Sequence, residues 1–343
     1  MAGGSGAAGI LLGEGGLDAW LDRVACLRAA ESALREVFLE RGYREVSVPA
    51  VEEVEAGLLP PGPGGSAPAP GGETAYRFLD HEGRVWALRT DVTPGLAGLL
   101  WHRDPDGPRP RRVFYVAEVY RRLPGQRGPV ALVQAGAEAV GVRGAHEDAA
   151  VLSLATAALC ALGLEEFQLA VGHVGFLKDF LDRAGLCEEG RDRILAALQA
   201  RDYVRLRSLA ASRLPAREAE ALARVLTWRG TPDDLLGEVL PSLGDLAGAG
   251  GRGEDLRLLL EACPREGNVL VDLGLVRDRA YYTGMVFEIS LPGLAQPVGG
   301  GGRYDGTLSP EPAAGFAFDL GAMMAARPLA GALRDRVRVS AIH

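Results

Sequence analysis

Two adjacent tyrosines and a run of four glycines stand close together near the C-terminal end of the sequence. Tyr281 and Tyr282 lie in the segment VRDRAYYTGMVFE, and residues 299–305 read GGGGRYD. Consecutive glycines lose much conformational entropy on folding, so they indicate backbone that adopts positive φ or approaches something very closely. A flexible loop is the ordinary interpretation of a glycine run alone, but beside two phenol rings we interpret it as part of a small-ligand site. We therefore predict that residues 299–305 form a glycine turn beside a small ligand.

A second polar group lies on a predicted β-hairpin. The segments RRVFYVAEVYR, at residues 111–121, and VQAGAEAVGV, at residues 133–142, both read as strands and are joined by a short loop. Because side chains alternate along a strand, Gln134, Gly136 and Glu138 share one face. Because a glycine between two polar side chains leaves room for a ligand, this face is a candidate binding site. The alternative interpretation is that the face is polar because it is exposed to solvent.

The other segments predict an α+β fold in which a mainly antiparallel sheet is flanked by helices. Apolar spacing predicts a helix over residues 17–38, followed by a strand that ends at Pro49. A strand pair turns at residues 81–83, and a helix runs from Thr93 to Trp101. Residues 146–264 are mostly helical, apart from one strand at residues 167–174, and the sheet resumes at Val269.

This order of elements predicts one domain that is interrupted by an insertion. Residues 1–172 would form its first part, residues 173–266 a mostly helical insertion, and residues 267–343 the remainder. Residues 58–74 are rich in proline and glycine and predict a mobile loop.

Composition narrows the class of protein. The 343 residues are 48% hydrophobic and 24% charged, with a formal net charge of −8, which argues against general binding to nucleic-acid backbones. The four cysteines lack zinc-type spacing, so we expect neither a metal nor a cofactor. No apolar run reaches the roughly 18 residues of a transmembrane helix, and the N-terminus lacks the features of a signal peptide. A cytoplasmic protein is therefore predicted.

Several motifs together resemble a known family. RGYREVSVP resembles motif 1 of class II aminoacyl-tRNA synthetases, and ALRTDVTP with FYVAEVYRR and VQAGAEAVG resembles the substrate strand and motif 2 of their histidyl branch. VRDRAYYTGMVFE and GGGRYDG are similar to the two histidine-recognition motifs of that branch, and GFAFDLGAMM stands where motif 3 belongs. The motifs occur in the family's order across residues 17–333. The resemblance implies a class II synthetase-like fold with a histidine pocket.

The resemblance also implies how the ends of a histidine molecule would be held. Asp91, Thr93 and Gln134 would bind its α-ammonium, and Arg277 would face its carboxylate. These pairings agree with general chemistry, because an ammonium prefers acidic or carbonyl partners and a carboxylate prefers a guanidinium.

The imidazole ring would be recognised by a different set of residues. Glu138 and Tyr282 would bond to it. Tyr281 would close the site together with a pocket turn formed by Gly301, Gly302, Arg303 and Tyr304. An imidazole needs one hydrogen-bond partner on each of its nitrogens, which a carboxylate and a phenol can supply.

The sequence departs from the synthetase pattern where a nucleotide would bind. Ala322 stands in place of the motif 3 arginine that clamps the phosphates of ATP, and Asp319 stands where the family prefers glycine. Arg121 is kept and would be a remnant of the nucleotide site, but Arg122 is followed by a short loop without the expected acidic and basic residues. The sequence stops at His343, soon after motif 3, so we expect no anticodon-binding domain and no tRNA partner.

These departures favour one branch, the regulatory subunits of ATP phosphoribosyltransferase, which are paralogues of histidyl-tRNA synthetase. LRTDVTP favours the same branch. The resemblance implies a non-catalytic subunit of a glycosyltransferase complex, forming a homodimer within a hetero-oligomer with short-form catalytic subunits and responding to L-histidine. One alternative is a truncated histidyl-tRNA synthetase or a synthetase-like amino-acid-activating enzyme. Another is a free-standing histidine sensor.

Overall fold

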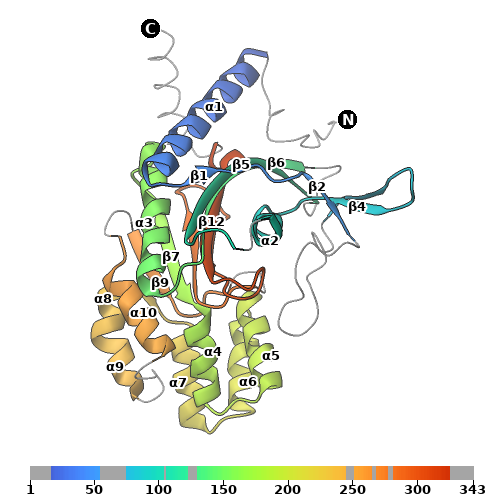
Figure 1. Ribbon diagram of the computed structural model, residues 1–343. Coiled ribbons are helices and arrows are strands. Elements are labelled where there is room, and N and C mark those ends of the chain that lie inside the picture. The colour runs from blue at the N-terminus through green and yellow to red at the C-terminus, as the bar shows by residue number, and fades with distance from the viewer. Residues whose placement is uncertain are drawn as a thin grey trace, which may run out of the picture.

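A large sheet forms the centre of the protein (Figure 1). The computed structural model describes residues 17–54, 75–103, 106–122, 130–244, 251–264, 268–276 and 281–324. Within them, nine strands lie side by side in the order β1 (Arg44–Glu45), β5 (Arg111–Arg121), β6 (Val130–Val140), β12 (Ala313–Asp319), β11 (Gly299–Arg303), β10 (Met285–Ser290), β7 (Gln168–His173), β9 (Asn268–Asp272) and β8 (Arg229–Gly230). Neighbouring strands are antiparallel except in the pairs β1–β5 and β7–β9. The predicted α+β fold, with its mainly antiparallel sheet, is confirmed.

Helices cover the sheet and extend below it (Figure 1). They are α1 (Leu17–Glu40), α2 (Thr93–Arg103), α3 (Ala145–Ala161), α4 (Val174–Arg183), α5 (Glu188–Gln199), α6 (Tyr203–Ala211), α7 (Ala216–Leu226), α8 (Pro232–Asp234), a π-helical turn (Leu235–Val239), α9 (Leu240–Leu243), α10 (Arg252–Glu261) and α11 (Leu320–Met324). None of the described helices is long and apolar enough to cross a membrane.

The helix and hairpin predictions in the first half of the chain are confirmed. α1 ends at Glu40, and Gly42 follows it with a φ of 78°, a left-handed conformation that glycine adopts without strain. β5 and β6 pair as the predicted hairpin, with Tyr115 opposite Gly136. A separate small sheet has the order β2 (Val51–Glu53), β4 (Val85–Leu88) and β3 (Arg77–Leu79), and its β3–β4 pair is the predicted strand pair.

The two faces of the large sheet differ in chemistry. On one face, Ala135 and Ala137 of β6 and Phe316 and Phe318 of β12 pack with α1 and α3 in an apolar core. The side chains between them point to the opposite face, where α2 also packs. Alternation along β6 and β12 therefore sends the polar residues away from the main core.

The helices α4–α7 and α10 pack around a second apolar cluster, which also contains Val271 and Leu273 at the end of β9. This region contains the predicted helical insertion, whose boundaries stay a prediction. The proline- and glycine-rich loop at residues 58–74 lies outside the described residues.

The prediction that the glycine run forms a turn is wrong, because these residues form a strand. Gly301, Gly302 and Arg303 belong to β11, an interior strand of the sheet that pairs with β10 and β12, and Tyr304 follows it directly. The glycines are needed for close approach rather than for a bend. A Cβ on Gly301 would lie 2.0 Å from the backbone oxygen of Gly315 on the neighbouring strand.

Candidate functional site

A cavity of about 160 Å³ opens on the polar face of the sheet. It is lined by parts of β6, β11 and β12, by the start of α2 and by the two adjacent tyrosines. The predicted site residues that line it are Asp91, Thr93, Arg121, Gln134, Glu138, Tyr281, Tyr282 and Tyr304. Drug-sized ligands occupy pockets of roughly 300–1,000 Å³, so this cavity suits a smaller metabolite.

Not every predicted residue contributes to the cavity. Gly301, Gly302 and Arg303 are absent from its lining, although all three are described. Arg277, predicted to face a carboxylate, and the loop at residues 123–129 lie outside the described residues.

Glu138 is the most deeply buried acid of the cavity, with 1% of its surface exposed. The hydroxyl of Thr93 donates to Glu138 Oε1 at 2.7 Å, and the hydroxyl of Tyr304 donates to Oε2 at 2.7 Å. Burial raises the pKa of Glu138 to about 8, against the opposing effect of these two hydrogen bonds. A group so poised can give or take a proton near neutral pH, as a partner for imidazole must.

Glycines on the neighbouring strands make the space for these side chains. Gly315 lies opposite Glu138 in the sheet, and a Cβ on Gly315 would come within 1.7 Å of Glu138 Oε2. A Cβ on Gly302 would lie 2.8 Å from the ring of Tyr282. Gly302 therefore leaves room for the ring of Tyr282, although it does not line the cavity itself.

Asp91 and the tyrosines form another part of the cavity lining. The hydroxyl of Tyr281 donates to Asp91 Oδ2 at 3.2 Å, and the backbone N–H of Thr93 donates to Asp91 Oδ1 at 3.3 Å. The ring of Tyr281 packs against that of Tyr282, with centroids 4.8 Å apart, and meets the ring of Tyr304 edge-on. This part of the lining is thus aromatic with one carboxylate, a combination that suits a small cation.

Gln134 adds a hydrogen-bond acceptor. Its Oε1 is buried and has no hydrogen-bond partner among the described residues. Buried polar atoms in native proteins are nearly always paired, so this oxygen indicates that a donor binds in the cavity.

A carboxylate lies next to Ala322, the position where the resemblance places the phosphate clamp. Asp319 ends β12 and lines the cavity, and its Oδ1 accepts a hydrogen bond of 2.9 Å from the backbone N–H of Ala322. Burial raises the pKa of Asp319, and the nearby charge of Arg121 opposes that shift. Arg121 Nε itself donates to the backbone oxygen of Thr90 at 2.7 Å.

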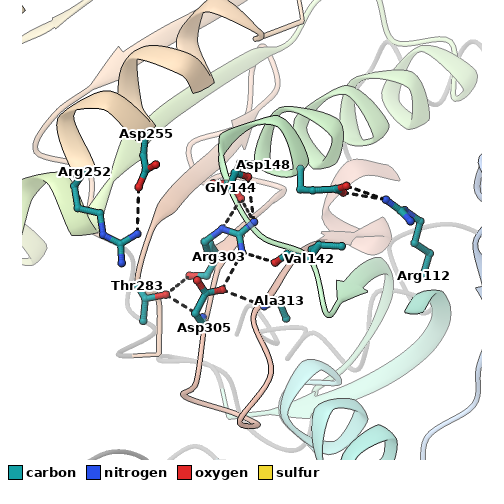
Figure 2. Close-up of polar contacts among 11 residues, drawn as sticks. Arg112, Val142, Gly144, Asp148, Arg252, Asp255, Thr283, Arg303, Asp305 and Ala313 are labelled. Atoms are coloured by element: carbon teal, nitrogen blue, oxygen red, sulfur yellow. Dashed lines mark hydrogen bonds and ion pairs between the residues drawn. The ribbon is translucent and has the colours of Figure 1, made fainter. Parts of the chain in front are cut away.

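Arg303 lies in a buried polar network away from the cavity (Figure 2). Its Nε donates to Asp148 Oδ1 on α3 at 2.8 Å, and its Nη1 donates to Asp305 Oδ1 and to the backbone oxygen of Val142, both at 2.9 Å. The prediction that Arg303 closes the pocket is therefore wrong. The residue ties the end of β11 to α3 and so positions the adjacent Tyr304, whose hydroxyl reaches Glu138.

The charges of the cavity favour a cationic or hydrogen-bond-donating ligand. Among the described residues that line it, Asp91, Glu138 and Asp319 are acidic and Arg121 is basic. Because Glu138 is largely protonated near neutral pH, this balance comes from Asp91 and Asp319 against Arg121. It disfavours a triphosphate and favours an ammonium group, while the Glu138 carboxyl can share a hydrogen bond with an imidazole. The described residues contain no cluster of three or more His, Cys, Asp or Glu that could hold a metal ion.

Comparison with known proteins identifies the family. The family model described as histidyl-tRNA synthetase matches residues 18–323. The chain belongs to the histidyl-tRNA synthetase family. A protein of Symbiobacterium thermophilum named ATP phosphoribosyltransferase regulatory subunit is 36% identical to it over 342 residues, covering 96% of this chain and 83% of that protein. A histidine–tRNA ligase of Methanocaldococcus jannaschii is 31% identical, covering 87% of this chain and 71% of the ligase.

Solved structures agree with the histidyl-tRNA synthetase-like fold. A crystal structure described as an ATP phosphoribosyltransferase regulatory subunit/histidyl-tRNA synthetase from Bacillus halodurans superposes with a TM-score of 0.75 at 26% identity, covering 94% of this chain and 82% of that one. The resemblance to the regulatory subunits that the motifs indicated is confirmed by several relatives of that name at 34–36% identity.

Some contributors to the site were missed in the sequence. Gly315 carries no side chain, and its role follows only from its position opposite Glu138. Asp148 pairs with Arg303 across 155 positions of sequence, and no local pattern connects the two residues.

Proposed function

We propose that this chain is a non-catalytic regulatory subunit of ATP phosphoribosyltransferase, acting in the first step of histidine biosynthesis and in its response to histidine. The names of its relatives support the class of protein. The cavity supports the ligand. In this proposal L-histidine binds with its imidazole between Glu138 and Tyr282, and its α-ammonium near Asp91, Thr93 and Gln134.

The size and chemistry of the cavity support histidine as its ligand. An amino acid fits a volume of about 160 Å³, and its imidazole can donate to or accept from Glu138 as that carboxyl titrates. The unpaired oxygen of Gln134 suits a hydrogen from the α-ammonium. The part of the pocket that would face the α-carboxylate, at Arg277, rests on the resemblance alone.

The observation that carries the non-catalytic part of the proposal is the position of Asp319. Its carboxylate accepts the backbone N–H of Ala322 at the start of α11, where donors of this kind would otherwise suit a phosphate. Ala322 supplies no guanidinium, and Asp319 sets a negative charge against Arg121. Phosphoryl and adenylyl chemistry depends on cationic clamps, so we propose that the chain forms no histidyl-adenylate.

The test combines binding with catalysis. Calorimetry of the purified chain should show histidine binding, and histidine-dependent ATP–pyrophosphate exchange should be at background. Mixing the chain with a short-form catalytic subunit should raise phosphoribosyltransferase activity and yield a hetero-oligomer by mass measurement. Robust exchange by the lone chain would refute the non-catalytic role, and absence of a complex would refute the regulatory one.

An amino-acid-activating enzyme is the second candidate, because a histidine–tRNA ligase also stands among the relatives. Arg121 lines the cavity and is the feature that favours it. The same exchange assay distinguishes the two functions, since only the enzyme would, as the lone chain, catalyse histidine-dependent exchange of pyrophosphate into ATP.

We also propose how the subunit assembles. A homodimer of this chain would join short-form catalytic subunits in the cytoplasm, without tRNA, a membrane or a cofactor. The mass of the mixed complex tests the stoichiometry directly.

A further inference from the structure

A second cavity lies beside the strands β9 and β8 at the edge of the sheet. Its volume is about 520 Å³, within the range of small-molecule sites. The end of α5, the start of α6 and the strands β8, β9 and β10 surround it. Its charged and hydroxyl-bearing side chains are Arg201, Tyr203, Arg229, Asp272 and Glu288.

Arg201 has a backbone conformation that arginine rarely adopts. Its φ is 53°, and it is the one non-glycine residue with positive φ in the described part of the chain. An L-residue in the left-handed region is strained, because its Cβ comes too close to the following carbonyl oxygen. Such an outlier is a reason to ask what the side chain does.

Arg201 is the left-handed residue that follows the end of α5, and three other helices of this chain have a residue in the same position. α1, α3 and α4 end in the same pair of hydrogen bonds as α5, and in each the left-handed position is a glycine: Gly42, Gly163 and Gly185, with φ between 78° and 83°. In α5 the corresponding bonds run from Arg201 N to Leu198 O and from Asp202 N to Ala197 O. The chain therefore places a side chain instead of glycine at the one of these four helix ends that lines the cavity.

Arg229 is held in position beside Arg201. Its Nε bonds to Asp272 Oδ2 at 2.8 Å, and its Nη2 donates to the hydroxyl of Tyr203 at 3.4 Å. Asp272 is itself fixed by the backbone N–H of Gly274 at 3.0 Å. This support orients one face of the guanidinium, as an oxyanion site requires.

The ion pair between Arg201 and Glu288 is long and weak. Arg201 Nη2 lies 4.0 Å from Glu288 Oε2, which is too long for a hydrogen bond. The arginine side chains are 66% and 46% exposed, whereas those of Glu288 and Asp272 are 21% and 10% exposed. Seen from solvent, the mouth of the cavity therefore presents guanidinium groups, and the carboxylates lie behind them.

We propose that this cavity binds a small anionic metabolite, whose oxyanion group, a carboxylate or a phosphate, is held by the guanidinium groups of Arg201 and Arg229. An incoming oxyanion can take the donors of Arg201 without breaking a strong hydrogen bond. Planar guanidinium groups bind both kinds of oxyanion in bidentate fashion. The site is separate from the histidine cavity and does not depend on the proposed function.

Calorimetric titration with inorganic phosphate and with citrate tests the site. Arg201→Gly should weaken binding at least about tenfold, through loss of a charge-assisted hydrogen bond. The same change relieves the left-handed strain, so the melting temperature should rise by about 2 °C. A gain in stability together with a loss of binding excludes misfolding as the cause.

Matched variants complete the test. Arg207→Ala removes an exposed arginine of α6 that does not line the cavity, and it should leave phosphate and citrate binding unchanged. Arg229→Lys keeps the positive charge but loses the planar N–H donors that bind an oxyanion in bidentate fashion, so it should weaken binding. Preference for phosphate or for citrate identifies the oxyanion. The proposal is overturned if the wild-type protein binds neither probe at millimolar concentration, or if Arg201→Gly binds both as tightly as wild type.

Discussion

Replacement of Glu138 by glutamine is predicted to stabilise the protein in a strongly pH-dependent way. The carboxyl group is 1% exposed and has a pKa raised by burial to about 8. Glutamine has the same shape and no charge. Its amide oxygen can accept from one of the two hydroxyls of Thr93 and Tyr304, and its NH₂ can donate to the other. The variant should therefore keep the packing and the hydrogen bonds.

The size of the effect follows from proton linkage. In the unfolded chain the pKa of Glu138 has its ordinary value near 4.5, whereas burial in the folded protein raises it to about 8. Between these values the folded state binds more protons than the unfolded state. The free energy of unfolding of the wild-type protein then falls by about 1.4 kcal/mol for each pH unit gained. Glutamine escapes this loss, so Glu138→Gln should be more stable by about 3 kcal/mol at pH 7.

Urea unfolding of both proteins across a pH series measures this difference. The advantage of the variant should be near zero at about pH 4.5, grow through neutral pH and level off above about pH 8. Glu82→Gln is a matched control, because Glu82 has a 56% exposed side chain in a surface turn, and its effect should not follow this profile. A stability difference for Glu138→Gln that is independent of pH, or that favours wild type at pH 7, would refute the reasoning.

The same variant should bind histidine less tightly. Losing the buried carboxyl that can give a proton to the imidazole or take one from it leaves an unsatisfied polar group worth about 1–3 kcal/mol, or roughly a 5- to 150-fold rise in the dissociation constant. Stability and binding would then change in opposite directions, which simple damage to the fold would not produce. Unchanged affinity in calorimetry would show that Glu138 does not contact the ligand.

Two further predictions concern the support of the site. Arg303→Met leaves the buried carboxylate of Asp148 without its partner and should lower the free energy of unfolding by about 3–5 kcal/mol; chemical denaturation checks this, and a loss under 1 kcal/mol, which is roughly the value of an exposed pair, would contradict it. Gly315→Ala puts a methyl group 1.7 Å from Glu138 Oε2, so it should abolish histidine binding in calorimetry and lower the melting temperature. Gly237→Ala is its control, because nothing lies within 4 Å of that Cβ, and equal effects of the two changes would refute the steric argument.

Local patterns in the sequence were enough to predict the elements that bring most of the site together. Alternation along β6 correctly placed Gln134 and Glu138 on one face, and both line the cavity. The helix before β1 and the β5–β6 hairpin also follow from periodicity within one segment. These predictions succeeded because each depends on residues that are neighbours in sequence.

The glycine run shows where such reasoning fails. A run of glycines is typical of turns and loops, yet residues 299–303 form an interior strand. The reason lies in the strands on either side, since a Cβ at Gly302 would meet Tyr282 and one at Gly301 would meet the backbone of β12. Sheet register between distant segments is set by the whole fold. A single sequence gives no local signal for it.

The cavity therefore owes its shape to missing side chains in the middle of a rigid sheet. Glu138, Gly315, Gly302 and Val286 are successive partners across β6, β12, β11 and β10, so the acid lies beside two positions without side chains. Space enclosed by paired strands needs little reorganisation when a small ligand enters, which favours binding. The same rigidity holds Asp319 against the first turn of α11. In the proposed function, the sheet that preforms the amino-acid pocket also holds the Asp319 carboxylate against the backbone N–H of Ala322, where its charge would oppose a phosphate and so disfavour adenylation.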